Sequence, residues 1–466
     1  MDIKKKNKFC LKRIPCLFKK YKLFLLLTMV FDHARNIYGQ PVRPNIVLII
    51  ADDMGWDDVS FHGSDQILTP NIDMLAYTGV ALERYYSHCI CTPTRSALLT
   101  GKYSYVTGMQ GYPLTNSEDR GLPVTEKIMP QYLKDLGYAT HLVGKWHVGQ
   151  SRTAFLPTMR GFDTHYGHRG GFIDYYEYTL QEADETGEEV SGLGLFRNMS
   201  AAWEDEGYVT DLYTKEAKAI ITSHDELAPL FLTVAHNAPH SGNAAAVLQA
   251  PAEYVRSMRH IESPQRRIFA AMVKKLDESV GEIVNALLDK GILNNTIIAF
   301  ISDNGGMTTG DSMNYASNWP LRGIKMTPFE GGNLRGIIGR NPPYLDSLQN
   351  SIVYKVLRRI DKPFNFKKME IRDEIKVICN KVKSKENDLC YPQNNYWCLF
   401  NIKEDPCEVH DVSAKNPRIV HNMMTRLRKE LERVKSRNKT IYRDPRSFPR
   451  LHNYSWDIWA DNIAMA

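Results

Sequence analysis

The sequence has no apolar run long enough to cross a membrane. The run from Leu23 to Phe31 has about nine residues, whereas a spanning helix needs roughly 20. It follows a basic stretch over residues 1–22, and the two together predict a signal-peptide region over residues 1–40, with cleavage between Phe31 and Gln40. A short membrane anchor is the alternative. We therefore expect a protein that enters the endoplasmic reticulum and has no transmembrane segment.

The sequence also lacks a large excess of one charge. Lys and Arg number 59, Asp and Glu number 53, and the formal net charge is +6. Much of this excess lies in the basic leader, so the rest of the chain is close to neutral. Such a balance is no argument for binding nucleic acid, and we expect no nucleic-acid partner.

Internal repeats and coiled-coil heptads are absent. Hydrophobic residues make up 43% of the chain and charged residues 24%, which is typical of a globular protein with a sizeable core. The length of 466 residues suits one large α/β domain and a smaller second domain.

Cysteine is sparse, with eight in the chain, and Cys10 and Cys16 lie in the leader. Four others cluster towards the C-terminal end and predict two disulfide bonds, with three pairings open: Cys379, Cys390, Cys398 and Cys407. Glycosylation sequons begin at Asn198, Asn294, Asn438 and Asn453. With the leader, these features predict a glycoprotein that is lysosomal or secreted.

Apolar runs alternate with helical patterns along the chain. Asn45 to Ala51, Pro229 to Ala235 and Thr296 to Ile301 are continuous apolar runs, as expected for central parallel strands. Residues 265–290 carry apolar side chains at helical spacing. The alternation predicts an α/β fold with a mostly parallel, doubly wound sheet and helices on both faces.

Acidic residues follow two of these runs directly. Asp52 and Asp53 come after the first, and Asp303 and Asn304 after the last. Because ligand sites form beyond the carboxyl ends of parallel strands, these side chains are candidates for one metal site. Their hard oxygen atoms suit Ca²⁺ or Mg²⁺. The alternative is that they cap helices or turns.

An unusual motif, Cys91-Thr92-Pro93-Thr94-Arg95, precedes a helical stretch. Pro93 disfavours helix at Thr92, so we expect an extended segment around Cys91. The alternative is an ordinary buried cysteine beside a helix start.

Cationic candidates follow other strands. Lys145 and His147 come after one strand, His240 after another, and Lys325 lies in a later loop. An anionic ester needs cations around its non-bridging oxygens and a proton donor at its leaving oxygen. A lone Lys or His is more often a solvated group, which is our interpretation of His141 and His236.

These motifs resemble those of the type I sulfatase family, most closely the arylsulfatase B group, over residues 44–335. The matching segments are Ala51 to Gly63, Thr69 to Leu75, Cys91 to Gly101, Gly137 to His147, Ser302 to Gly306 and Asn318 to Gly332. The resemblance implies an alkaline-phosphatase-like α/β/α sandwich with a small C-terminal α+β domain. It also implies a sulfuric ester hydrolase for aryl sulfates or sulfated sugars, in particular 4-sulfated N-acetylgalactosamine of glycosaminoglycans.

The resemblance further implies roles for individual residues. Cys91 would be oxidised to formylglycine, an aldehyde, by the formylglycine-generating enzyme. One calcium ion would be held by Asp52, Asp53, Cys91, Asp303 and Asn304. The remaining catalytic residues would be Arg95, Lys145, His147, His240 and Lys325.

The chain departs from the family in three places. Thr94 and Lys102 are mild replacements for Ser and Arg. After Gly336 the family continues through a strand and a helix that we do not find here, so residues 41–336 predict a catalytic domain and residues 337–466 a shortened, disulfide-bearing region. We infer an internal deletion near residues 337–351, which predicts an exposed sheet edge. It also leads to a second function hypothesis, a catalytically impaired isoform or paralogue that binds sulfated glycans or is non-functional. A phosphatase or phosphodiesterase of the same superfold is a third, weakened because those enzymes usually place Ser or Thr where Cys91 stands.

Overall fold

The strands form where the sequence has its continuous apolar runs. The computed structural model describes residues 43–82, 84–310, 313–331, 343–362, 364–379, 390, 397–436 and 443–462. The expected signal region therefore lies outside the described residues. From Asn45 onward the chain is one compact unit. No helix among the described residues is both long and apolar enough to cross a membrane.

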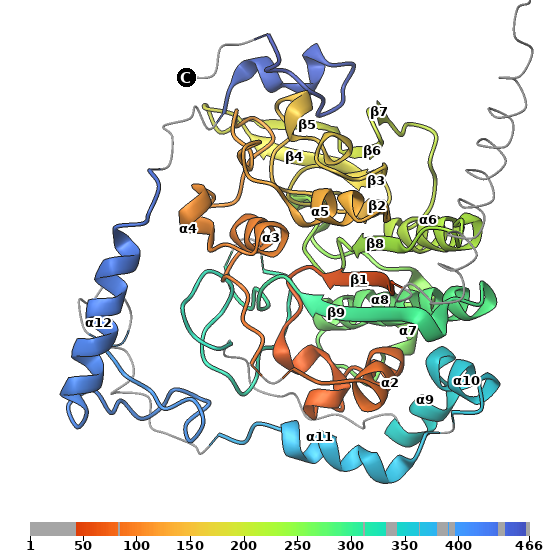
Figure 1. Cartoon of the computed structure of the whole chain (residues 1–466), viewed down its shortest axis with the longest axis vertical. Coiled ribbons are helices and arrows are strands. Elements are labelled where there is room, and N and C mark those ends of the chain that lie inside the picture. The colour runs from red at the N-terminus through yellow and green to blue at the C-terminus, as the bar shows by residue number, and fades with distance from the viewer. Residues whose placement is uncertain are drawn as a thin grey trace, which may run out of the picture. The chain divides into compact units, whose positions relative to one another are not determined.

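The central sheet has seven strands in the order β7-β6-β3-β2-β8-β1-β9, which Figure 1 shows from top to bottom. The strands are β1 (Asn45–Ala51), β2 (Ala139–Gly144), β3 (Thr164–His168), β6 (Leu195–Arg197), β7 (Ser200–Ala201), β8 (Leu230–Ala235) and β9 (Thr296–Ser302). The five strands from β3 to β9 in that order run parallel, and β6 and β7 add an antiparallel edge. A separate antiparallel pair joins β4 (Thr179–Ala183) and β5 (Glu189–Leu193). The predicted mostly parallel sheet is confirmed.

Helices cover both faces of this sheet. Successive side chains of a strand point to opposite faces, so Val47 and Ile49 of β1 pack in one apolar cluster, and Leu48 and Ile50 in another. The first cluster includes α6 (Val209–Ser223) and α8 (Pro264–Asp289), and the second is packed by α3 (Cys91–Thr100) and α5 (Met129–Asp135). The other α-helices among the described residues up to the end of β9 are α2 (Pro70–Thr78), α4 (Ser104–Thr107) and α7 (Ala252–Ser257). This arrangement is the α/β/α sandwich that the resemblance implied.

Strand β9 is an edge of the sheet among the described strands. It pairs only with β1, and the side chain of Ile297 is 54% exposed. This agrees with the edge expected from the shortened sequence. Two short helices, α9 (Tyr344–Asn350) and α10 (Ile352–Arg359), lie near this end, and Val353 and Val356 of α10 are buried against α2 and α8.

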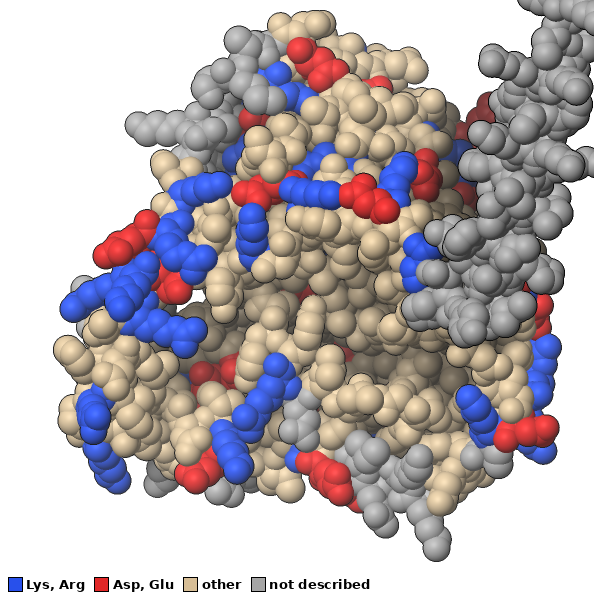
Figure 2. Space-filling model, in the orientation of Figure 1, with Lys and Arg blue, Asp and Glu red and all other residues tan. Residues whose placement is uncertain are grey.

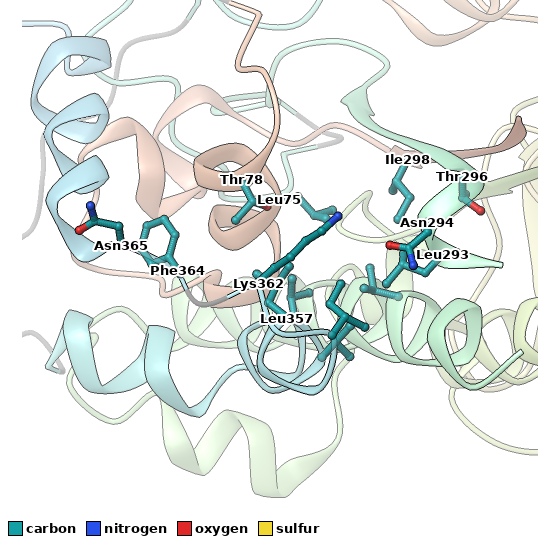
Figure 3. A pocket seen from close by; sticks show the side chains of 14 residues that line it. Leu75, Thr78, Leu293, Asn294, Thr296, Ile298, Leu357, Lys362, Phe364 and Asn365 are labelled. Carbon is teal, nitrogen blue, oxygen red and sulfur yellow. The ribbon is translucent and has the colours of Figure 1, made fainter. Parts of the chain in front are cut away.

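A cavity of about 470 Å³ remains between β9, α2, α8 and α10. Figure 3 shows Thr296 and Ile298 of β9 on one side of it and Phe364 on the other, with Lys362 reaching across. The helices after residue 343 therefore cover this end of the core only in part.

The C-terminal region is helical where the structure describes it. It contains α11 (Glu370–Ile375) and α12 (Pro417–Leu431), and its only strand-like feature among the described residues is a bridge between Ser455 and Leu193. The antiparallel sheet that the resemblance implied for a small domain is not found in these residues, which retain helices and turns. The disulfide bonds join Cys379 to Cys407 and Cys390 to Cys398. Two bonds were predicted, and the structure selects one of the three pairings.

Candidate active site

The carboxylates lie together because two parallel strands end side by side. Ala51 of β1 is in register with Ser302 of β9, so Asp52 and Asp303 leave the sheet as neighbours. These two residues, Asp53 and Asn304 are each at most 2% exposed. The backbone N–H of Asp53 donates to Asp303 Oδ1 at 3.2 Å. These side chains therefore lie together at one edge of the sheet, as the sequence predicted.

Asn304 has an unsatisfied acceptor within this cluster. Its Nδ2 donates to Asp53 Oδ1 at 2.6 Å, and its buried Oδ1 has no hydrogen-bond partner among the described residues. Potential ligand atoms of Asp52, Asp53, Cys91 and His240 also lie within 4.8 Å of one another. A buried oxygen without a partner, beside several carboxylates, is what a hard cation would satisfy.

Helix α3 carries Cys91 and Arg95 into the cluster. Cys91 is the first residue of the helix and is 1% exposed, and its Sγ lies 3.8 Å from Asp52 Oδ1. Arg95, one turn later, places Nη2 2.9 Å from Asp303 Oδ2 and 3.7 Å from Asp52 Oδ1.

The expectation of an extended segment around Cys91 is wrong for the folded chain. Thr92 and Pro93 both belong to α3. Proline is tolerated there because the first-turn N–H groups of a helix have no partner within the helix. Ile90, the residue before the helix, is extended.

Strand β2 delivers Lys145 and His147. Lys145 Nζ lies 2.6 Å from Asp52 Oδ2 and is fully buried. His147 Nε2 lies 2.9 Å from the carbonyl of Leu114, and its Nδ1 has no partner among the described residues. The hydroxyl of Thr92 donates to the His147 carbonyl at 3.0 Å, which ties this histidine to the start of α3.

Lys325 and His240 approach Asp53 from the other side. Lys325 Nζ lies 2.7 Å from Asp53 Oδ2 and 3.3 Å from His240 Nε2. His240 Nδ1 lies 2.7 Å from the carbonyl of Ser241, so this nitrogen carries a proton and Nε2 faces the site. The structure therefore brings together all the site residues that the sequence analysis named.

The formal charges of this site balance without an ion. Counted as ionised, the three carboxyl groups of Asp52, Asp53 and Asp303 face three cations, Arg95, Lys145 and Lys325. Burial raises the pKa of Asp52 to about 8, and the neighbouring Lys145 and Arg95 act in the opposite direction. A bound divalent cation would bring the formal charge to +2, which suits an anionic substrate.

Burial controls the acid–base state of the cysteine. It raises the pKa of the Cys91 thiol to about 12, although Lys145 and Lys325 act in the opposite direction. An unmodified Cys91 is therefore a neutral thiol at physiological pH and a poor nucleophile.

Two residues that support the site were missed by the sequence analysis. The ring of Phe172 stacks on that of His240, with centroids 5.7 Å apart and planes 11° apart. The amide of Asn314 donates to the carbonyl of Asp53 at 2.9 Å and to that of Pro239 at 3.2 Å. Neither residue has a local sequence signal, because each acts through a segment distant in the chain.

The interpretation of His236 as a solvated group is wrong, because its side chain is fully buried. Its Nε2 lies 3.0 Å from the hydroxyl of Ser279, and burial lowers its pKa to about 3. The folded chain thus keeps it neutral, while in the unfolded chain it gains a proton below about pH 6.5. Its contribution to stability is present above that pH and is lost as the pH falls.

We expect a pH-dependent difference between the parent chain and His236→Gln. Relative to this variant, the free energy of unfolding of the parent should fall by about 1.4 kcal/mol per pH unit below pH 6. Denaturant titrations of both proteins at pH 7, 6 and 5 measure the difference, in which the other titrating groups cancel. A difference that stays constant over this range would contradict the assignment.

Comparison with known proteins agrees with this geometry. A family model described as Sulfatase matches residues 44–338. Arylsulfatase J of Mus musculus is 35% identical, over 90% of this chain and 80% of its own length. N-acetylgalactosamine-6-sulfatase of Mus musculus is 33% identical over 63% of this chain, which spans only 56% of that relative.

A solved structure, that of Ps i-CgsB, superimposes with a TM-score of 0.65 at 28% identity, covering 85% of this chain and 94% of that one. None of these proteins is arylsulfatase B, so the closer resemblance to that group stays a prediction. The family match and the shared fold establish the family and the class of reaction. The chain belongs to the sulfatase family and is a sulfuric ester hydrolase with the fold of the type I sulfatases.

Proposed function

We propose that this sulfatase removes sulfate from 4-sulfated N-acetylgalactosamine in glycosaminoglycans, using a formylglycine made from Cys91 and one calcium ion. The observation that carries the proposal is the position of Cys91. Its side chain is buried where three carboxylates and three cations meet. Among the relatives, N-acetylgalactosamine-6-sulfatase is named for the same sugar with sulfate at another position.

The residues present fit a calcium ion. Asp52, Asp53, Asp303 and Asn304 offer carboxylate and amide oxygens, and Asn304 Oδ1 lacks another partner among the described residues. When bound, the ion would supply positive charge for the sulfate and favour ionisation of a hydroxyl at residue 91.

The burial of Cys91 in α3 bears on when it is modified. A side chain 1% exposed at the start of a helix offers no extended segment to a modifying enzyme. We therefore propose that the formylglycine-generating enzyme acts on the unfolded chain in the endoplasmic reticulum, before α3 forms, on the way to the lysosome or to secretion. The hydrated aldehyde would supply one hydroxyl to attack sulfur and a second to expel the sulfate afterwards.

The neighbouring side chains would then hold the ester. Lys145 and Lys325 are placed to bind the non-bridging oxygens of the sulfate. His240 and Lys325, 3.3 Å apart, would hold the proton that the leaving sugar oxygen takes up. His147 would contact residue 91, and Arg95 would hold Asp303 and Asp52 in position.

The proposal is tested with sulfated disaccharides. The purified, secreted enzyme should hydrolyse a 4-sulfated galactosaminide faster than its 6-sulfated isomer. It should lose activity on treatment with a chelator and regain it with Ca²⁺. Preference for the 6-sulfate would overturn the sugar assignment. Full activity without any bound divalent metal would overturn the role of calcium.

The shortened C-terminal region favours a second candidate function, a catalytically impaired form. The open edge of β9 and the adjoining cavity of about 470 Å³ are the observations behind it. A chain that is secreted and melts cooperatively, contains formylglycine, and yet turns over no sulfate ester would support it over the active enzyme.

A further inference from the structure

Helix α12 is a basic element with no buried side chain. Residues 417–436 contain six Lys and Arg against two Glu. Among the described residues, Arg418, Arg428 and Lys429 form no ion pair. Figure 2 shows Lys and Arg side chains gathered on the side of the molecule where Figure 1 places α12, beside a hollow in the surface. Arg433 pairs with Glu430 at 2.7 Å and Lys435 with Glu126 at 3.5 Å, and the basic side chains that remain indicate an anionic partner.

The end of α12 is attached to the catalytic region. Tyr105 of α4 donates its hydroxyl proton to Glu430 at 2.9 Å, and the backbone N–H of Lys435 donates to the Tyr105 carbonyl at 2.9 Å. Gln110 donates to the carbonyl of Lys435 at 2.8 Å. These bonds hold the helix against α4, which follows the helix that carries Cys91.

The attachment places α12 beside the segment that carries Cys91. The backbone N–H of Ser104, at the start of α4, donates to His88 Nε2 at 3.5 Å. The carbonyl of His88 also accepts the hydroxyl proton of Thr94 in the first turn of α3, at 3.0 Å. Helix α4, to which α12 is bound, therefore lies near the end of α3 that holds Cys91.

The position of α12 favours one kind of anionic partner. Because Glu430 contacts Tyr105, the face of α12 that holds Glu430 is turned towards α4. Arg426 and Lys429 fall along the side of this face at helical spacing. Arg433, two residues beyond the end of α12, continues this side and pairs with Glu430 at 2.7 Å. Since this end of the helix is attached beside the segment that carries Cys91, an anionic chain whose reacting unit lies in the site could lie along it.

We propose that Arg426, Lys429 and Arg433, the basic stripe at the C-terminal end of α12 and just beyond it, bind sulfate and carboxylate groups of a polymeric sulfated glycan whose reacting unit occupies the active site. The inference rests on the proposed function and deepens it, since it assigns to the glycosaminoglycan chain a second binding surface beyond the reacting sugar. Guanidinium groups suit this task because they bind sulfate and carboxylate oxygens in pairs.

The test compares two double variants with equal loss of charge. R426Q/K429Q changes the basic stripe, and K355Q/R358Q changes exposed residues of α10, which packs on α2 and α8. Relative to the parent, we expect R426Q/K429Q to have a KM for polymeric chondroitin sulfate that is about fivefold higher. Its kcat and its hydrolysis of a small aryl sulfate should be unchanged. The control variant should match the parent. An unchanged KM for the polymer in R426Q/K429Q, or an equal rise in the control, would overturn the proposal.

A binding measurement separates this inference from the proposed function. In a Cys91→Ala background, chondroitin sulfate should bind with an affinity that falls about fivefold in R426Q/K429Q and drops with added salt. If the parent binds the polymer through this stripe but hydrolyses no ester, the proposed function fails and the binding surface stands. If R426Q/K429Q loses binding to phosphatidylserine vesicles that the parent shows, while its binding of chondroitin sulfate is unchanged, the stripe binds membranes and is refuted as a glycan surface.

Discussion

Replacing Cys91 with alanine is expected to lower sulfate ester hydrolysis to background, a loss of at least about 10³-fold in kcat. The variant keeps the carboxylates and cations but has no group at residue 91 that can attack sulfur. The loss should appear with small aryl sulfates and with sulfated sugars alike, because it concerns the reacting atom and not substrate binding. Steady-state rates on both substrates measure it.

The control for this variant is another cysteine of the same segment. Cys89 is an exposed free cysteine two residues before Cys91, and Cys89→Ala should retain the activity of the parent. Peptide mass spectrometry of the parent should find an aldehyde at residue 91 and an ordinary thiol at residue 89. Unmodified cysteine at both positions in an active enzyme would rule out formylglycine as the nucleophile.

Replacing Asp303 with alanine is expected to cost both activity and stability. Burial would raise the pKa of Asp303, but Arg95, Lys145 and Lys325 together hold this pKa below its usual range, so the residue is an anion in the folded chain. Arg95 binds it at 2.9 and 3.2 Å. Without this partner Arg95 is a buried cation short of its nearest carboxylate, which typically costs about 3–5 kcal/mol.

The same substitution removes one of the proposed calcium ligands. We expect a loss of about 10²–10³ in kcat and less than one equivalent of bound calcium by elemental analysis. Asp65→Ala is the control, because Asp65 forms an exposed pair with Arg372 and its loss should change stability by less than about 1 kcal/mol. Stoichiometric calcium and full activity in Asp303→Ala would refute the ligand assignment.

The sequence alone predicted the positions at which the site forms. Continuous apolar runs identify β1 and β9 as buried parallel strands, and the carboxyl ends of such strands meet at one edge of a sheet. The clustering of Asp52, Asp53, Asp303 and Asn304 follows from that rule without any side-chain detail. Lys145 also follows a strand end, but its role, like those of Cys91 and Lys325, came from the family resemblance, because a single cation or cysteine does not by itself indicate a site.

The tertiary structure decided the interactions between segments far apart in the chain. It determines that Lys145 pairs with Asp52 and Lys325 with Asp53, that Phe172 stacks on His240, and that Thr92 is helical. The sequence predicted two disulfide bonds but could not pair their cysteines, because pairing depends on how the loops between them fold. The placement of α12 beside α4 likewise could not be predicted, because it depends on contacts between segments far apart in the chain. Local patterns specify which side chains leave the end of each strand, whereas contacts between distant segments depend on the packing of the whole chain.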